Sequence, residues 1–201
     1  AGFRIVRTIP LCTAYFLARI IFRFYFYADS RRRRRTIQHI LHAGMEKDYG
    51  AARRLAKKNF GNYAKTAVEI VKMDQILTPG NLSEKIEYKG DPELIEKYFK
   101  GEKTSPVIIV TSHSGNWELA GITYTISSGI PLLSVMRHMA NRKLEKFFYK
   151  RENNHNHYSC LKKGAIKSLL SALRKGESIA IVADQHASSS EGIETSFFGH
   201  P

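Results

Sequence analysis

The sequence predicts an α/β protein with a mostly parallel central sheet flanked by helices, preceded by an N-terminal helical segment. Over residues 107–183, short apolar runs typical of buried strands alternate with amphipathic helical patterns, an order that favours a parallel sheet. Residues 1–35 differ, because they consist of an apolar stretch followed by consecutive arginines. We therefore expect two parts: the N-terminal segment, residues 1–35, and an α/β domain, residues 36–201.

Composition and charge narrow the classes of function. The 201 residues, 43% hydrophobic and 25% charged, suffice for one domain with a real core and exclude a wholly disordered chain. Two cysteines exclude a disulfide scaffold and a cysteine-rich zinc module. The formal charge of +14 favours an anionic partner: a phospholipid surface, nucleic acid or a phosphorylated substrate. Residues 1–60 hold 14 Lys and Arg against 3 Asp and Glu, so +11 of this charge lies there.

Residues 3–27 are mostly apolar and aromatic, but Arg7, Arg19 and Arg23 interrupt them. A membrane-spanning helix needs about 20 apolar residues with few charges, which argues against a span. Arg19 and Arg23 are four residues apart and share one helix face. This pattern predicts an interfacial helix, with its arginines at lipid phosphates and its aromatic rings in the headgroup layer. The alternative is a buried core helix with snorkelling arginines.

Five consecutive arginines follow, and they cannot share one helix face. They are Arg31, Arg32, Arg33, Arg34 and Arg35. A solvated turn or a processing site is one interpretation, and contact with anionic lipid or nucleic acid is the other. No helix-turn-helix, RNP-type aromatic pattern or set of zinc ligands accompanies them, so we expect no nucleic acid partner. Beside the aromatic helix, these arginines together with Arg19 and Arg23 indicate a membrane surface with anionic lipid.

The remaining helices and strands are predicted from hydrophobic periodicity and from residues that end secondary structure. Residues 50–73 show helical spacing, residues 85–88 alternate like a strand, and Asp91 caps a short helix that Gly101 ends. The residues 107–110 form a continuous apolar run, typical of a strand buried on both faces. The further strands are expected at residues 131–136, 157–160 and 178–183, and the helices at 115–127, 141–152 and 163–175.

The first polar cluster follows the strand at residues 107–110 and contains His113 and Glu118. Five residues span about 140° of a regular helix, so the two side chains can pair only across a turn. The intervening Ser-Gly-Asn supplies one and would let Glu118 reach back to the imidazole. A carboxylate on one ring nitrogen fixes the tautomer and makes the other nitrogen a general base for a hydroxyl. The alternative is a capping histidine with a glutamate that complements the helix dipole.

A second polar cluster, Asp184-Gln185-His186, follows the last strand. Both clusters come at carboxyl ends of strands, where open α/β sheets bind ligands. A serine hydrolase is a competing interpretation, but neither Ser112 nor Ser114 lies in a Gly-x-Ser-x-Gly context. The histidines of residues 153–157 lack acidic or cysteine companions, which favours a solvated loop over a metal site.

These residues resemble the bacterial lipid A biosynthesis (lauroyl/myristoyl) acyltransferase family, within the H-x4-D/E glycerolipid acyltransferases. The resemblance covers essentially the whole chain and rests on an ordered set of motifs. The set comprises the arginine run after an apolar helix, Phe60 to Glu69, His113-Ser-Gly-Asn-Trp-Glu118, Val135-Met136-Arg137, Asn141 to Arg151, Leu173 to Gly176, Val182-Ala183-Asp184-Gln185, Gly192 and Phe197-Phe198-Gly199-His200-Pro201.

The resemblance implies a glycerolipid acyltransferase-like fold and a membrane-associated O-acyltransferase. It would move a fatty acyl group from acyl carrier protein or acyl-CoA to a hydroxyl of a glycolipid such as a lipid A precursor. His113 would act as general base, oriented by Glu118, with no metal and no cofactor. Substrate contacts would come from Asn116, Arg137, Arg151 and Asp184, with the arginines on phosphate. The implied location is the cytoplasmic face of the inner membrane.

Some features depart from the family pattern. His186 stands where an aspartate is common, and Asn141 to Arg151 is one residue shorter than usual. Family members continue beyond the Phe-Phe-Gly-x-Pro segment, so the resemblance implies a chain truncated at its C-terminus. The competing hypothesis is a non-catalytic basic module that binds membrane or nucleic acid.

Overall fold

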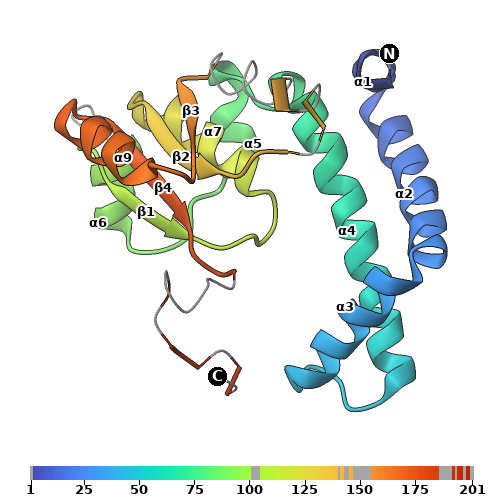
Figure 1. Ribbon diagram of the computed structural model, residues 1–201. Helices are drawn as coiled ribbons and strands as arrows, with labels where there is room; N and C mark the ends of the chain where they lie inside the picture. Colours follow the sequence, from blue (N-terminus) through green and yellow to red (C-terminus); the bar gives the residue numbers. More distant parts are fainter. Residues whose placement is uncertain are drawn as a thin grey trace. The chain divides into compact units, whose positions relative to one another are not determined.

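The computed structural model describes residues 2–100, 105–139, 141–142, 145–146, 155–185, 192, 194–196 and 198–199. Its contacts divide the chain into two compact units: residues 1–72 with 186–201, and residues 73–185. The described part of the first unit is mainly helical, and the second holds a parallel sheet with helices around it (Figure 1). The predicted α/β class with a preceding helical segment is confirmed.

The first unit begins with four helices: α1 (Gly2–Thr8), α2 (Leu11–Ala28), α3 (Ser30–His42) and α4 (Tyr49–Ile76), which runs on into the second unit. The corner between α2 and α3 is held by side chains. Asp29 accepts a hydrogen bond from the backbone N–H of Arg32 at 2.9 Å and so caps α3. The guanidinium of Arg33 donates to the backbone oxygens of Phe26 and Tyr27 at 2.8 and 2.7 Å. Helix ends leave such carbonyls unpaired, so Arg33 closes α2.

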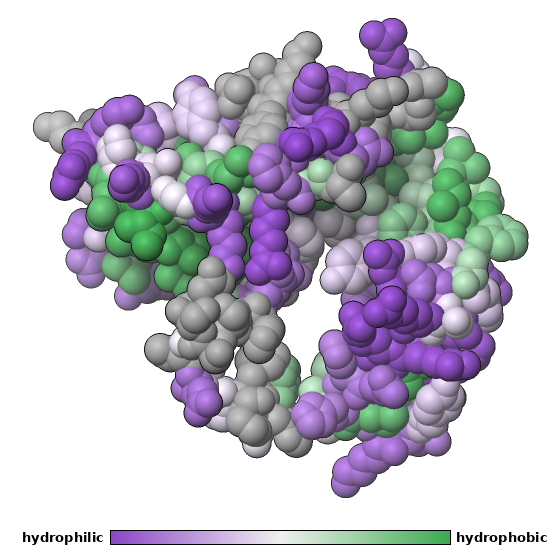
Figure 2. All heavy atoms as spheres, viewed as in Figure 1, coloured by the Kyte–Doolittle hydropathy of each residue, from purple (hydrophilic) through white to green (hydrophobic). Residues whose placement is uncertain are grey.

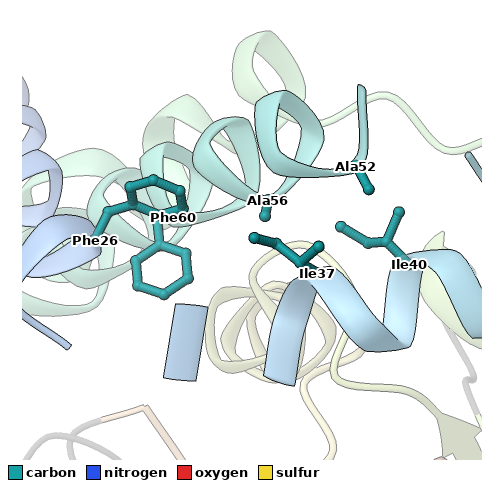
Figure 3. Close-up of a cluster of buried hydrophobic side chains, with 6 residues drawn as sticks. All are labelled: Phe26, Ile37, Ile40, Ala52, Ala56 and Phe60. Atoms are coloured by element: carbon teal, nitrogen blue, oxygen red, sulfur yellow. The ribbon is translucent and has the colours of Figure 1, made fainter. Parts of the chain in front are cut away.

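A buried apolar cluster joins α2, α3 and α4 (Figure 3). The rings of Phe26 on α2 and Phe60 on α4 meet edge to face, with centroids 5.2 Å apart. Ala52 and Ala56 on α4 are fully buried and lie close to Ile37 and Ile40 of α3 in Figure 3. Alanine at these positions lets the two helices approach closely. The helix predicted at residues 50–73 is thus confirmed.

Helix α2 combines length with an exposed apolar surface. Among the described residues it is the one helix long and apolar enough to cross a membrane by length and composition, with a mean hydropathy of 1.2. Only Ala14 and Phe26 of its residues are buried, which disagrees with the alternative of a buried core helix. Its exposed large apolar side chains are Leu11, Phe16, Leu17, Ile20, Ile21, Phe24 and Tyr27. Figure 2 shows hydrophobic colour over α2 and hydrophilic colour over α3.

The second unit contains the sheet and its covering helices. After short helical turns it alternates strands with helices, and its described elements are η1 (Pro79–Asn81), α5 (Leu82–Lys85), α6 (Pro92–Ile95), η2 (Glu96–Lys100), β1 (Ile108–Thr111), α7 (Trp117–Ser128), β2 (Leu132–Met136), β3 (His157–Leu161), α9 (Ala165–Arg174) and β4 (Ser178–Val182). The four strands predicted between residues 107 and 183 are all present, within one or two residues of their expected bounds.

The sheet is four-stranded and all parallel, in the order β1-β4-β2-β3. Strand β4 is last in sequence but lies between β1 and β2. The crossover from β1 to β2 runs across the sheet in one direction and that from β3 to β4 in the other. Because such crossovers are right-handed, α7 and α9 cover opposite faces. Tyr124 of α7 packs with Leu132 and Ala180 in the core of its face.

Three expectations are corrected by the fold. Residues 85–88 form no strand: the amide of Ile86 bonds back to Leu82 at the end of α5, and four alternating residues without a partner strand cannot form a ladder. The run at 107–110 is not buried on both faces, because Ile108 and Val110 of β1 are 58% and 69% exposed. His157 belongs to β3 and is buried, so the solvated-loop interpretation is wrong for it.

Candidate active site

The candidate site lies where β1 and β4 end side by side. In their parallel register Thr111 pairs with Val182, so the residues two positions further along each chain are also opposite each other. These are His113 and Asp184, the histidine of the first polar cluster and the acid of the second. The Nδ1 atom of His113 lies 2.7 Å from Oδ1 of Asp184. The backbone N–H of His113 donates to Oδ2 of the same carboxylate at 2.8 Å.

This double contact fixes the imidazole. A carboxylate only accepts, so Nδ1 carries the proton and Nε2 holds the free electron pair. Burial alone raises the pKa of Asp184, but the hydrogen bonds from the imidazole and amide of His113 outweigh it and hold that pKa below its usual value. Asp184 is therefore charged at neutral pH. The two side chains are 30% and 26% exposed, so the site stays open to a substrate.

The start of α7 completes the site from the other side. Gly115 adopts a φ of +63°, a left-handed conformation that turns the chain from β1 into the helix. Asn116 is the N-cap, and its side-chain oxygen accepts from the backbone N–H of Leu119 at 3.1 Å. The ring of Trp117 stands edge-on to the imidazole of His113, with centroids 4.9 Å apart. The indole N–H of Trp117 donates to Glu118 Oε1 at 3.1 Å.

Glu118 lies in the first turn of α7, as the sequence predicts, but its hydrogen-bond partner is Trp117. The carboxylate that meets the imidazole Nδ1 is that of Asp184. Loss of water raises the pKa of Glu118, and the hydrogen bond from Trp117 and the charge of His113 lower it by less. Glu118 and His113 thus interact electrostatically, while the hydrogen bond of Glu118 goes to Trp117. That Glu118 orients His113 stays a prediction.

The other predicted substrate contacts are distributed as follows. Arg137 comes directly after β2, so it lies at the same carboxyl edge of the sheet as His113 and Asp184, and it is exposed. Arg151 and His186 lie outside the described residues. The sequence placed Trp117 and Gln185 within the quoted motifs but assigned neither a role. The amide nitrogen of Gln185 lies 3.4 Å from Nε2 of His113, on the side that a substrate hydroxyl would occupy.

The predicted membrane-contacting arginines lie in the first unit and differ in their surroundings. Arg19, Arg23, Arg31, Arg34 and Arg35 are exposed. Arg32 is 3.7 Å from the carboxylate of Asp29, and Arg33 is bound to the end of α2. Arg33 thus has a structural role, which the sequence did not indicate. Membrane contact by the set stays a prediction.

A metal site was not expected from the sequence, and the described residues contain no group of three His, Cys, Asp or Glu side chains placed to hold a metal ion. Two histidines of the second unit instead make local contacts. His155 Nε2 lies 3.0 Å from Asp74 Oδ1, and His157 Nε2 lies 3.0 Å from Ser134 Oγ.

Comparison with known proteins gives one finding. A sequence model described as "bacterial lipid A biosynthesis acyltransferase" matches residues 1–201, the whole chain. Comparisons with curated proteins and with solved structures each give no significant match.

Proposed function

Since this chain belongs to the bacterial lipid A biosynthesis acyltransferase family and is therefore an acyltransferase, we propose that it is a membrane-associated O-acyltransferase. It moves a fatty acyl group from the thioester of acyl carrier protein or acyl-CoA to a hydroxyl of a glycolipid such as a lipid A precursor. The observation that carries the chemistry is the two-point contact between His113 and Asp184, which leaves Nε2 of His113 as a base.

In the proposed reaction, Nε2 of His113 takes the proton of the acceptor hydroxyl as its oxygen attacks the thioester carbonyl carbon. The carbonyl becomes an oxyanion and then re-forms as the carbon–sulfur bond breaks. The thiolate leaves and takes the proton back from the imidazolium, so an ester and a free thiol result. No covalent acyl-enzyme forms.

Two carboxyl groups would stabilise the imidazolium during this step. Asp184 holds the Nδ1 proton, and the charge of Glu118 acts on the ring from the α7 side. The first backbone N–H groups of α7, which begins at Trp117 four residues after His113, would suit the developing oxyanion. Arg137 at the same edge of the sheet, and Arg151, would bind phosphate of the donor or acceptor.

The proposed membrane association rests on α2 and the basic residues near it. Exposed aromatic and aliphatic side chains of α2 suit the headgroup and upper acyl region, and the arginines suit lipid phosphates. The inner membrane, and its cytoplasmic face, are the proposed location, because acyl carrier protein and acyl-CoA are intracellular donors.

The test is acyl transfer to a lipid A precursor by the intact protein and by His113→Ala. Removal of a general base lowers the rate by roughly 10²–10⁴-fold. Ser114→Ala, an exposed neighbour on the same turn, is the matched control and keeps its activity if the histidine is the base. Equal activity of His113→Ala and the native protein would reject the role of His113. Loss in Ser114→Ala alone would favour a serine hydrolase mechanism.

A further inference from the structure

A group of cations surrounds Tyr27, where α2 and α4 pack together in the first unit. Lys57 Nζ donates to the Tyr27 hydroxyl at 3.2 Å and lies 5.5 Å from the ring centroid. The guanidinium carbon of Arg53 lies 5.9 Å from the same centroid. Arg53 and Lys57 are one turn apart on α4, and Arg23 is one turn before Tyr27 on α2. The sequence did not single out Arg53 or Lys57, because they are 26 and 30 residues from Tyr27 along the chain.

We propose that Tyr27, Arg53 and Lys57 form a binding site for the phosphate of an anionic lipid headgroup. The site deepens the proposed membrane association and rests on it. It offers three kinds of donor to one anion: the ammonium of Lys57, the fork of the Arg53 guanidinium and the hydroxyl of Tyr27. Because Lys57 donates to the Tyr27 oxygen, the hydroxyl proton is left to point at the ligand.

The charge of this group is not neutralised within the described part of the chain. There, no carboxylate pairs with Arg23, Arg53 or Lys57, whereas Arg32 and Lys65 each have one at 3.7 and 3.6 Å. Like charges one turn apart on a helix repel each other. The hydrogen bond from Lys57 and then its positive charge, with smaller contributions from the charges of Arg53 and Arg23, lower the pKa of the Tyr27 hydroxyl. A bound phosphate would relieve this repulsion.

The surface beside the group favours lipid over other sources of phosphate. Phe16, Ile20, Phe24 and Tyr27 recur every three or four residues on α2 and are 63%, 39%, 72% and 47% exposed. They therefore form one stripe that ends at Tyr27. A lipid bilayer supplies apolar surface for the stripe and phosphate for the cations at its end. Nucleic acid supplies only the phosphate.

The experiment compares two doubly substituted proteins of equal charge. Arg53→Gln with Lys57→Gln removes the group, and Arg54→Gln with Lys58→Gln removes the adjacent exposed cations of α4, which do not contact Tyr27. Binding is measured by co-sedimentation with phosphatidylcholine vesicles that do or do not contain phosphatidylglycerol, and circular dichroism checks that both proteins keep their helix content. Tyr27→Phe tests the hydroxyl.

We expect the first protein to lose roughly 30-fold in affinity for the anionic vesicles, since each cation that contacts a lipid phosphate contributes about fivefold. The control should lose less than about threefold, and binding to pure phosphatidylcholine should be the same in all variants. Equal losses in both double variants would reject the site. A loss of polynucleotide binding without a loss of vesicle binding would replace lipid with nucleic acid. If the native protein bound no vesicles, both the proposed membrane association and the proposed site would be rejected.

Discussion

At the scale of single residues, the site depends on one carboxylate that meets two donors of the same histidine. Asp184 Oδ1 accepts from the ring of His113 and Oδ2 from its backbone. An amide at this position has only one oxygen, so its NH2 group must face one of the two donors. Asp184 is therefore placed to set both the tautomer and the position of His113.

This arrangement predicts that Asp184→Asn affects catalysis more than substrate binding. We expect kcat to fall by roughly 10²-fold or more with a small change in KM, because the Asn NH2 group either opposes the His113 amide or forces Nδ1 to accept. Initial rates over a range of acceptor concentrations separate kcat from KM. Ser114→Ala, the control variant for His113→Ala, serves as the comparison. A variant with native kcat would show that the contact is not used in turnover.

His157 is a second residue with a measurable effect, in this case on how stability depends on pH. Burial, followed by the charge of His155, lowers the pKa of His157 from 6.5 to about 4. Its Nδ1 is buried without a partner among the described residues, which agrees with a neutral ring. Between these two values the unfolded chain binds the proton and the folded one does not, so stability falls as the pH drops from about 6.5 to about 4.

We expect the free energy of unfolding to be about 2 kcal/mol lower at pH 5 than at pH 7 through this residue alone. Urea unfolding at the two pH values measures the difference. The glutamine of His157→Gln does not titrate in this range. The free energy of unfolding of this variant should therefore fall by about 2 kcal/mol less between pH 7 and pH 5 than that of the native protein. Identical pH dependences would mean that folding does not lower the pKa of His157.

At the scale of elements, a glycine decides how closely α7 packs on β3. A Cβ atom at Gly121 would lie 2.9 Å from Cε1 and 3.2 Å from Nδ1 of His157, which is closer than van der Waals contact permits. The same helix carries Trp117 and Glu118 in its first turn. The small residue thus lets α7 place its N-terminus against the sheet.

Two glycine-to-alanine substitutions should therefore change the free energy of unfolding in opposite directions. Gly121→Ala should lower the free energy of unfolding by about 1–3 kcal/mol through overpacking against His157. Gly61→Ala, in the middle of α4 with no atom within 4 Å of the new Cβ, should raise it by about 0.5–1 kcal/mol because alanine favours the helix. Denaturant midpoints provide the measurement. The same sign for both would contradict the close packing at Gly121.

At the scale of the whole molecule, charge and chemistry are carried by different parts of the chain. Residues 1–60 hold +11 of the formal charge, and their helices expose both cations and apolar side chains. The candidate site belongs to the other unit, residues 73–185, at the carboxyl edge of the sheet. The proposed division is membrane docking by the first part and acyl transfer by the second.

The sequence by itself determined the four strands of the sheet, the helix at residues 50–73, the α/β class and both polar clusters, because hydrophobic periodicity and turn-forming residues act within a few residues. It also placed His113, Glu118 and Asp184 near strand ends. Only the tertiary structure decided that β4 lies between β1 and β2, since strand order depends on packing across the sheet. That order brings Asp184 to His113 across 71 residues. In the same way, the packing of α2 on α4 assembled the cations around Tyr27, which no spacing along the chain could reveal.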